Sequence, residues 1–112
     1  MESSLYSAVK AALESFTRTW AEEFGANPQL EFMKGTTVNA VSAGLIDSDL
    51  ISSYGPEMRQ SLETKILPKQ SLGATIGKCE NVADIVGFLC SHDARWMTGS
   101  VVAANGGSRK VG

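Results

Sequence analysis

The stretch LYSAVKAALESFTRTWAEEFG, residues 5–25, decides how the fold begins. Its apolar residues follow one another at intervals of three or four, which places them in one stripe along an α-helix. The stripe consists of Leu5, Val9, Leu13, Phe16, Trp20 and Phe24. Ser3 or Ser4 can cap the start of this helix, and Gly25 can end it. The sequence therefore predicts a helix of about five turns.

Two segments rich in β-branched residues predict short buried strands. Residues 35–41 (GTTVNAV) run into a loop at residues 42–44 (SAG), and Asn39 is expected to satisfy strand backbone. Residues 100–104 (SVVAA) form the second strand, which is closed by residues 105–107 (NGG). Both strands are short, so neither can anchor a large sheet by itself.

The segments between and after the strands carry helical patterns. Residues 48–54 and 56–66 predict two short helical pieces, and Glu80 suits the N-terminal end of a further helix. The apolar face of that helix consists of Val82, Ile85, Val86, Leu89 and Cys90. Strands that are linked through helices predict a parallel α/β arrangement.

A sheet of two parallel strands leaves unpaired edges, and such edges recruit other chains. We therefore expect residues 1–112 to form a single α/β domain of two parallel strands plus helices, completed by oligomerisation. The apolar stripe within residues 5–24 would be partly unburied in a monomer, which predicts a dimer or a higher assembly.

The composition excludes several functional classes. A content of 43% hydrophobic and 20% charged residues is that of a globular protein. The net charge of −2, with scattered basic residues, argues against nucleic-acid binding. No apolar run reaches the ~18 residues of a membrane span, and no export signal is evident, so we expect a cytoplasmic protein. Cys79 and Cys90 lack metal-ligand spacing, which predicts reduced thiols and no metal site.

Tyr6 and Lys10 are four positions apart on the predicted helix, so they project from one face. A free phenol titrates near ~10, which is too high for an efficient acid or base at neutral pH. An ammonium at ~4 Å, with an effective dielectric near ~20, supplies about the 4 kcal/mol that a three-unit decrease requires. The pair is a candidate acid/base for a carbonyl or carbinol, and a solvated helix surface is the alternative interpretation.

Four blocks, in order, resemble the short-chain dehydrogenase/reductase family. Residues 6–10 (YSAVK) resemble its YxxxK active-site helix, and residues 37–44 (TVNAVSAG) resemble the strand written VNAVSPG. Residues 80–89 (ENVADIVGFL) are similar to its EDVA…FL helix, and residues 98–107 (TGSVVAANGG) to its terminal TG…DGG strand. The blocks cover nearly the whole chain, and the resemblance implies part of a Rossmann-like fold.

The resemblance implies roles for individual residues. Tyr6 would be the general acid/base, while Lys10 would tune it and bond the nicotinamide ribose. The loop after Gly44 would cover the nicotinamide, with the backbone of Ile46 and the hydroxyl of Ser48 binding the carboxamide and phosphate. From the residues alone, Ser48 can equally cap a short helix.

The resemblance also implies surfaces and a lid. Residues 45–75 would form the segment that faces the substrate. Copies of the chain would meet through the helix that bears Tyr6, and through the last helix and strand, which predicts a homodimer or larger homo-oligomer.

Parts of the family pattern are absent from these residues. No G-x-G-x-x-G turn occurs, and the family's active-site serine has no counterpart before Tyr6. Ala43 and Cys79 replace customary prolines, and Asn105 replaces an aspartate. We therefore expect a truncated family member without the dinucleotide-binding half, related to proteins that use NAD or NADP but unable to bind the cofactor alone.

The residues are compatible with three functions. By lineage the chain is part of an NAD(P)-dependent oxidoreductase of a carbonyl or alcohol substrate, if a missing half completes it. Alternatively, Tyr6 and Lys10 perform cofactor-independent acid/base chemistry, as in an isomerase, dehydratase or cyclase. In the third, the chain is a non-catalytic oligomeric binding module. The sequence does not decide whether the chain is an enzyme.

Overall fold

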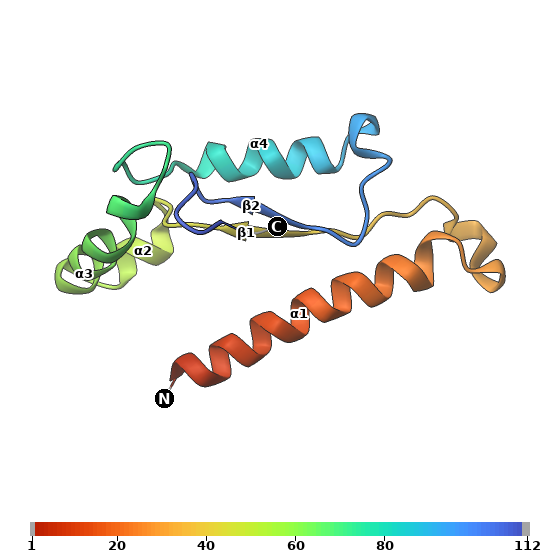
Figure 1. The fold of residues 1–112 in the computed structure, drawn as a ribbon, viewed down its shortest axis with the longest axis horizontal. Helices are drawn as coiled ribbons and strands as arrows, with labels where there is room; N and C mark the ends of the chain where they lie inside the picture. The colour runs from red at the N-terminus through yellow and green to blue at the C-terminus, as the bar shows by residue number, and fades with distance from the viewer. Residues whose placement is uncertain (1, 111–112) are drawn as a thin grey trace. The chain divides into compact units, whose positions relative to one another are not determined.

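The computed structural model describes residues 2–110 (Figure 1). Helices and strands follow one another along the chain in the order that the sequence predicts. Within the described residues the elements are α1 Glu2–Gly25, β1 Ala40–Ala43, α2 Asp49–Ser53, α3 Pro56–Ile66, α4 Cys79–Leu89 and β2 Val101–Ala104. Short 3-10 helices cover Pro28–Met33, Leu67–Lys69 and His92–Ala94.

The chain divides into two compact units. The first contains the described residues up to Ala40 together with Phe88–Val102. The second contains Val41–Gly87 and the described residues from Ala103 onward. Both strands run through both units. That the units together form one domain stays a prediction.

β1 and β2 form a two-stranded sheet. The N–H of Ala40 donates to the carbonyl of Ser100 at 2.9 Å, and the N–H of Gly44 donates to the carbonyl of Ala104 at 3.2 Å. Because the paired residues advance together along both strands, the strands are parallel. This confirms the predicted α/β arrangement of two parallel strands plus helices.

β1 begins later than the sequence predicts. The expected strand covered residues 35–41, whereas the ladder spans Ala40–Ala43. Just before the ladder, the N–H of Val38 donates to Oγ1 of Thr98 at 3.0 Å, so a side chain takes the place of a strand partner. β-branched residues here favour an extended backbone, but only the later residues find a neighbouring strand.

Asn39 joins the two strands at their start. Its Nδ2 donates to the carbonyl of Met97 at 3.0 Å, and its Oδ1 accepts from the N–H of Ser100 at 3.1 Å. The amide therefore supplies one donor and one acceptor to backbone groups that lie outside the ladder. This confirms the expectation that Asn39 satisfies strand backbone.

α1 ends at Gly25 as predicted, but the cap prediction at its start is wrong. The helix begins at Glu2, so Ser3 and Ser4 lie inside the helix and not ahead of it. The helical pieces predicted at residues 48–54 and 56–66 are confirmed as α2 and α3. Val82, Ile85, Val86 and Leu89 of the predicted apolar face lie on α4, whereas Cys90 follows the last residue of that helix.

Small residues, and not the apolar stripe, form the buried face of α1. Thr17 is 4% exposed and Ala21 is 9% exposed. The hydroxyl of Thr17 donates to the carbonyl of Leu13 at 2.9 Å. Gly99, at a φ of +71°, passes so close that an added Cβ would lie 3.5 Å from the Cβ of Ala21. Small side chains let the backbone of the Gly99 turn approach the helix closely.

The apolar stripe of α1 is exposed in this structure. The exposed fraction falls from 71% at Leu5 to 40% at Trp20. Trp20 stacks between Phe16 and Phe24, with ring centroids 5.1 Å and 6.4 Å apart. Of the helices in residues 2–110, none has the length and apolar character of a membrane span.

Candidate functional site

Tyr6 and Lys10 are neighbours on α1, within the first unit. The Nζ of Lys10 lies 5.4 Å from the centroid of the Tyr6 ring, which is the range of a cation–π contact. The i, i+4 spacing produces this contact, because residues four apart share one helix face. Tyr6 is 65% exposed, so the phenol is open to a ligand or to solvent. The helix thus aligns the pair, and its catalytic role stays a prediction.

Gly44 closes β1 in the second unit. A Cβ at this position would lie 2.8 Å from the Cβ of Asn105 and 2.9 Å from its Cα. Backbone atoms cannot move away as the end of a long side chain can, so a glycine is required where the two strands end. The backbone position at which the following loop begins is therefore fixed by the contact of Gly44 with Asn105.

Ile46 forms an isolated parallel bridge with Gly77. The N–H of Gly77 donates to the carbonyl of Leu45 at 3.0 Å, and the N–H of Asp47 donates to the carbonyl of Gly77 at 2.8 Å. A Cβ on Gly77 would lie 2.7 Å from Cδ1 of Ile46, so the two residues are in close contact. The bridge fixes the backbone on both sides of Ile46.

The same bridge leaves the backbone of Ile46 free to bind something else. In a planar trans peptide the N–H and C=O point in opposite directions. The carbonyl of Leu45 and the N–H of Asp47 point at Gly77, so the N–H and C=O of Ile46 point away from it. Neither group of Ile46 forms a hydrogen bond within residues 2–110. One donor and one acceptor on the same side match a carboxamide, which has one of each.

Ser48 immediately precedes α2, two residues after Ile46. It occupies the N-cap position, but its side chain forms no capping hydrogen bond, so the alternative role as a helix cap is not confirmed. Ser48 is half-buried, and its hydroxyl is not used by the helix. The structure brings Gly44, Ile46 and Ser48 together in one short loop of the second unit, whereas Tyr6 and Lys10 belong to the first unit.

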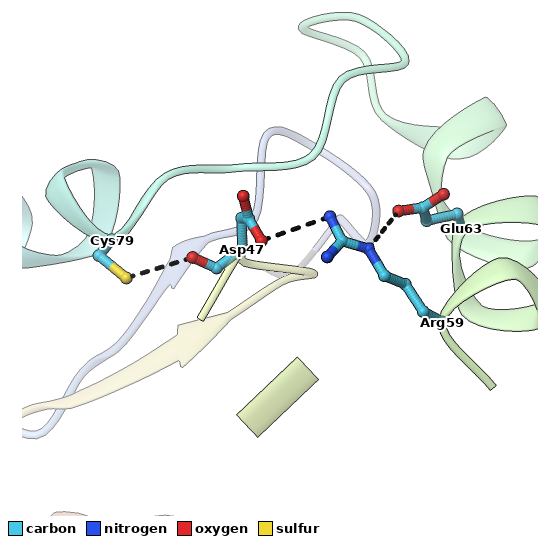
Figure 2. A network of polar contacts seen from close by, with 4 residues as sticks. All are labelled: Asp47, Arg59, Glu63 and Cys79. Atoms are coloured by element: carbon cyan, nitrogen blue, oxygen red, sulfur yellow. Dashed lines mark hydrogen bonds and ion pairs between the residues drawn. The ribbon is translucent and has the colours of Figure 1, made fainter. Parts of the chain in front are cut away.

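Arg59 is a residue that sequence reasoning missed. It lies on α3 in the second unit, and Figure 2 shows its guanidinium between two carboxylates. Its Nη2 lies 3.3 Å from Oδ1 of Asp47, and its Nε lies 3.0 Å from Oε1 of Glu63. The side-chain hydrogen bond with Glu63 raises the pKa of Arg59; partial burial opposes this, and the charge of Asp47 adds to it. The i, i+4 spacing of Arg59 and Glu63 was a readable signal, but the contact with Asp47 was not.

The cysteines and Trp96 form no further site among the described residues. Within residues 2–110, no cluster of three or more His, Cys, Asp or Glu side chains is arranged to hold a metal ion. Cys79 and Cys90 are free and exposed. Trp96 is 97% exposed.

Comparison with known proteins decides the family. A family model described as enoyl-(acyl carrier protein) reductase matches residues 1–109. The short-chain dehydrogenase/reductase FrzI of Cladobotryum sp. is 40% identical over 108 residues, which cover 93% of this chain and 39% of FrzI. The chain belongs to the short-chain dehydrogenase/reductase family. The resemblance seen in the sequence is thereby confirmed.

Further proteins that are similar to this chain support the same family assignment. The 3-oxoacyl-[acyl-carrier-protein] reductase FabG of Pseudomonas aeruginosa is 40% identical over 102 residues, covering 91% of this chain and 36% of that protein. A structure of 4-hydroxyisoleucine dehydrogenase complexed with NADH matches with a TM-score of 0.72 and 31% identity. It covers 92% of this chain and 38% of that one.

A structure of the angucycline C-6 ketoreductase LanV with bound NADP matches with a TM-score of 0.70 and 30% identity, over 92% of this chain and 35% of LanV. These likenesses confirm the partial Rossmann-like fold. The chain spans less than two fifths of the length of each relative named here.

Proposed function

We propose that this chain supplies the acid/base pair and the nicotinamide-side loop of an NAD(P)-dependent oxidoreductase that acts on a carbonyl or alcohol substrate. The observation that carries the proposal is the pair of unbonded peptide groups of Ile46, held on one side by the bridge to Gly77. Two similar proteins of known structure are described as complexes with NADH and NADP.

In this proposal the described residues supply groups for one end of the coenzyme. The N–H and C=O of Ile46 would bond the carboxamide, the unused hydroxyl of Ser48 would bond a phosphate, and Lys10 would bond the ribose. When bound, the nicotinamide supplies or accepts the hydride. The glycine-rich turn that cradles a pyrophosphate does not occur among these residues. We therefore expect residues 1–112 alone to bind the nicotinamide end weakly and not to bind NAD(P) tightly.

Tyr6 and Lys10 would handle the proton. In the reducing direction the phenol of Tyr6 donates its proton to the carbonyl oxygen as negative charge develops there, and in the oxidising direction the phenolate takes the proton of the carbinol. In this proposal Lys10 would supply a positive charge beside the phenol, and its Nζ lies 5.4 Å from the centroid of the Tyr6 ring.

The exposed stripe of α1 supports assembly with further copies of the chain. Its large apolar side chains lie in the open over most of the helix, and such surface is normally covered in a working protein. We propose a homodimer or larger homo-oligomer that uses α1, with α4 and β2 as a second contact. The free Cys79 and Cys90 suit a reducing compartment such as the cytoplasm.

A fragment titration tests the coenzyme proposal directly. Reduced nicotinamide mononucleotide, which carries only the nicotinamide end, is titrated into labelled residues 1–112 while backbone amide signals are recorded. We expect shifts at Ile46, Asp47 and Ser48 at millimolar ligand. Adenosine monophosphate, the other end of the coenzyme, is the matched control and should leave these signals in place.

The same experiment separates the alternatives. If the amide signals of Ile46 and Ser48 do not shift when the nicotinamide nucleotide is added, the oxidoreductase proposal is contradicted. Conversion of a carbonyl substrate without coenzyme, lost in Tyr6→Phe, would instead establish cofactor-independent acid/base chemistry. If the assembled protein neither turns over a substrate nor binds the nucleotide, the remaining function is that of a non-catalytic binding module.

A further inference from the structure

Asp47 is held at three separate atoms within the second unit, and Figure 2 shows two of these contacts. Its N–H donates to the carbonyl of Gly77 at 2.8 Å. Its carbonyl accepts a long contact from Sγ of Cys79 at 3.5 Å, at the start of α4. Its carboxylate meets the guanidinium of Arg59 at 3.3 Å. The first two contacts fix the backbone, and the third joins that backbone to α3.

Arg59 makes the third contact as part of a pre-aligned pair. Glu63 bonds Nε, so the guanidinium is already oriented when Nη2 reaches Asp47. The side chains of Arg59 and Glu63 are each 34% exposed and that of Asp47 is 53% exposed, so the network is only partly shielded from water. A single exposed ion pair is worth little, but a planar fork shared by two carboxylates restricts geometry more strongly.

The N–H of Asp47 and the C=O of Ile46 belong to the same peptide plane. Any rotation of that plane that breaks the bond to Gly77 also turns the carbonyl of Ile46 away from its open side. Arg59 therefore restrains, through Asp47, the acceptor half of the donor–acceptor pair. Because Arg59 lies on α3, the restraint depends on where α3 lies.

We propose that Arg59 is a positioning residue, which fixes the direction of the Ile46 carbonyl through Asp47 and couples that direction to α3. The significance of this coupling for coenzyme binding rests on the proposed function. The coupling itself concerns only contacts within the second unit. Displacement of α3 by a substrate would then loosen the group that holds the nicotinamide.

Amide hydrogen exchange on residues 1–112, without any ligand, tests the coupling. In Arg59→Gln we expect the amides of Asp47 and Gly77 to exchange about fivefold faster than in the wild type. The amide of Gly44, bonded to Ala104 in the sheet, is the internal control and should keep its rate. Lys65→Gln removes the same charge from the exposed side of α3, where no ion pair is recorded for the described residues, and should change nothing at Asp47.

Two further variants show whether Glu63 acts through Arg59. Glu63→Gln should accelerate exchange at Asp47 less than Arg59→Gln does, and should add nothing in the Arg59→Gln background. Sodium chloride at 0.5 M should move the wild type toward the variant, because salt screens a partly exposed network. Unchanged exchange at Asp47 in Arg59→Gln, or equal acceleration at Gly44, would overturn the proposal.

Failure of the coupling and failure of the proposed function give different results. If exchange at Asp47 responds while nicotinamide mononucleotide does not bind, the positioning role stands and the oxidoreductase proposal falls. If the nucleotide binds with the same affinity in Arg59→Gln and in the wild type, and exchange is unchanged, the positioning role falls alone. If both proposals hold, Arg59→Gln weakens nucleotide binding about fivefold, and Lys65→Gln does not.

Discussion

Gly77 lies against Ile46 so closely that a methyl group added at Gly77 would sit 2.7 Å from Cδ1 of Ile46. The same methyl would come 3.3 Å from the carbonyl oxygen of Leu45. The end of the isoleucine side chain can rotate away, but the carbonyl is part of the bridge itself. The glycine is thus required by the geometry that exposes the peptide groups of Ile46.

Gly77→Ala should lower the free energy of unfolding by roughly 1 kcal/mol, because the added methyl overpacks the bridge. Chemical denaturation of the two proteins measures this loss. Gly87→Ala, within α4 where no atom lies within 4 Å of an added Cβ, is the matched control. It should stabilise the chain by up to about 1 kcal/mol, since alanine favours a helix interior. An unchanged free energy of unfolding in Gly77→Ala would show that the contact with Ile46 and Leu45 does not restrict residue 77.

Gly44→Ala should cost more than Gly77→Ala. At Gly44 the methyl would meet Cα and Cβ of Asn105 at 2.9 Å and 2.8 Å, and these atoms cannot move without shifting the strand end. A loss of about 2–3 kcal/mol is expected. Equal losses in the two variants, measured by the same denaturation curves, would mean that the strand end is free to yield.

Tyr6→Phe should lower kcat by about 10²–10⁴ in a preparation that reduces a carbonyl substrate, because the proton donor is removed while the ring remains. Circular dichroism should be unchanged, since the Tyr6 side chain is largely exposed. Tyr54→Phe removes the chain's other phenol and is the control. The role of Tyr6 would be rejected if both variants kept the wild-type rate.

Phe16→Glu should shift any assembly of the chain toward monomer, since a charge in the middle of the stripe is costly to cover. Light scattering coupled to size-exclusion chromatography reports the mass. Thr19→Glu adds the same charge to an exposed position of α1 outside the apolar stripe, and should leave the mass as in the wild type. An assembly that tolerates Phe16→Glu does not use this surface.

Arg59→Lys should open a stability difference from the wild type that widens above about pH 10, where an ordinary lysine loses its proton. The pKa of Arg59 is raised by its hydrogen bond with Glu63, so its stabilising contribution persists below that raised value and is lost only as pH rises through it. Thermal melting of both proteins between pH 7 and 11 measures the difference. A constant difference across that range would argue against a charge-dependent role of residue 59.

Patterns with a short period were the part of this molecule that sequence could predict. The three- and four-residue spacing predicted α1, and the same rule brought Lys10 to the ring of Tyr6. The contacts that depend on distant residues were not predictable in the same way. The sequence around Val38 does not indicate that its N–H will bond the side chain of Thr98 and not a neighbouring strand. The start of β1 was therefore predicted too early.

In the candidate site, too, local patterns were predictable from the sequence and contacts between distant residues were not. Gly44, Ile46 and Ser48 were found by family resemblance, but the reason that Ile46 can bind a ligand lies in Gly77, thirty-one residues further along. Arg59 was missed because its partner Asp47 lies on another element. The 97% exposure of Trp96 was not predictable, because an indole is usually an interior group and residue spacing does not reveal its surroundings.

The side chain of Asn39 bonds to residues 58 and 61 positions further along, and Val38 to one 60 positions away. During synthesis, at about 5–20 residues per second, the first strand therefore waits on the order of 3–12 seconds before its partner leaves the ribosome. Through that interval its backbone groups are open to any extended segment nearby. A chaperone that shields nascent extended chain should increase the yield of folded protein, and slowing translation after residue 44 should decrease it.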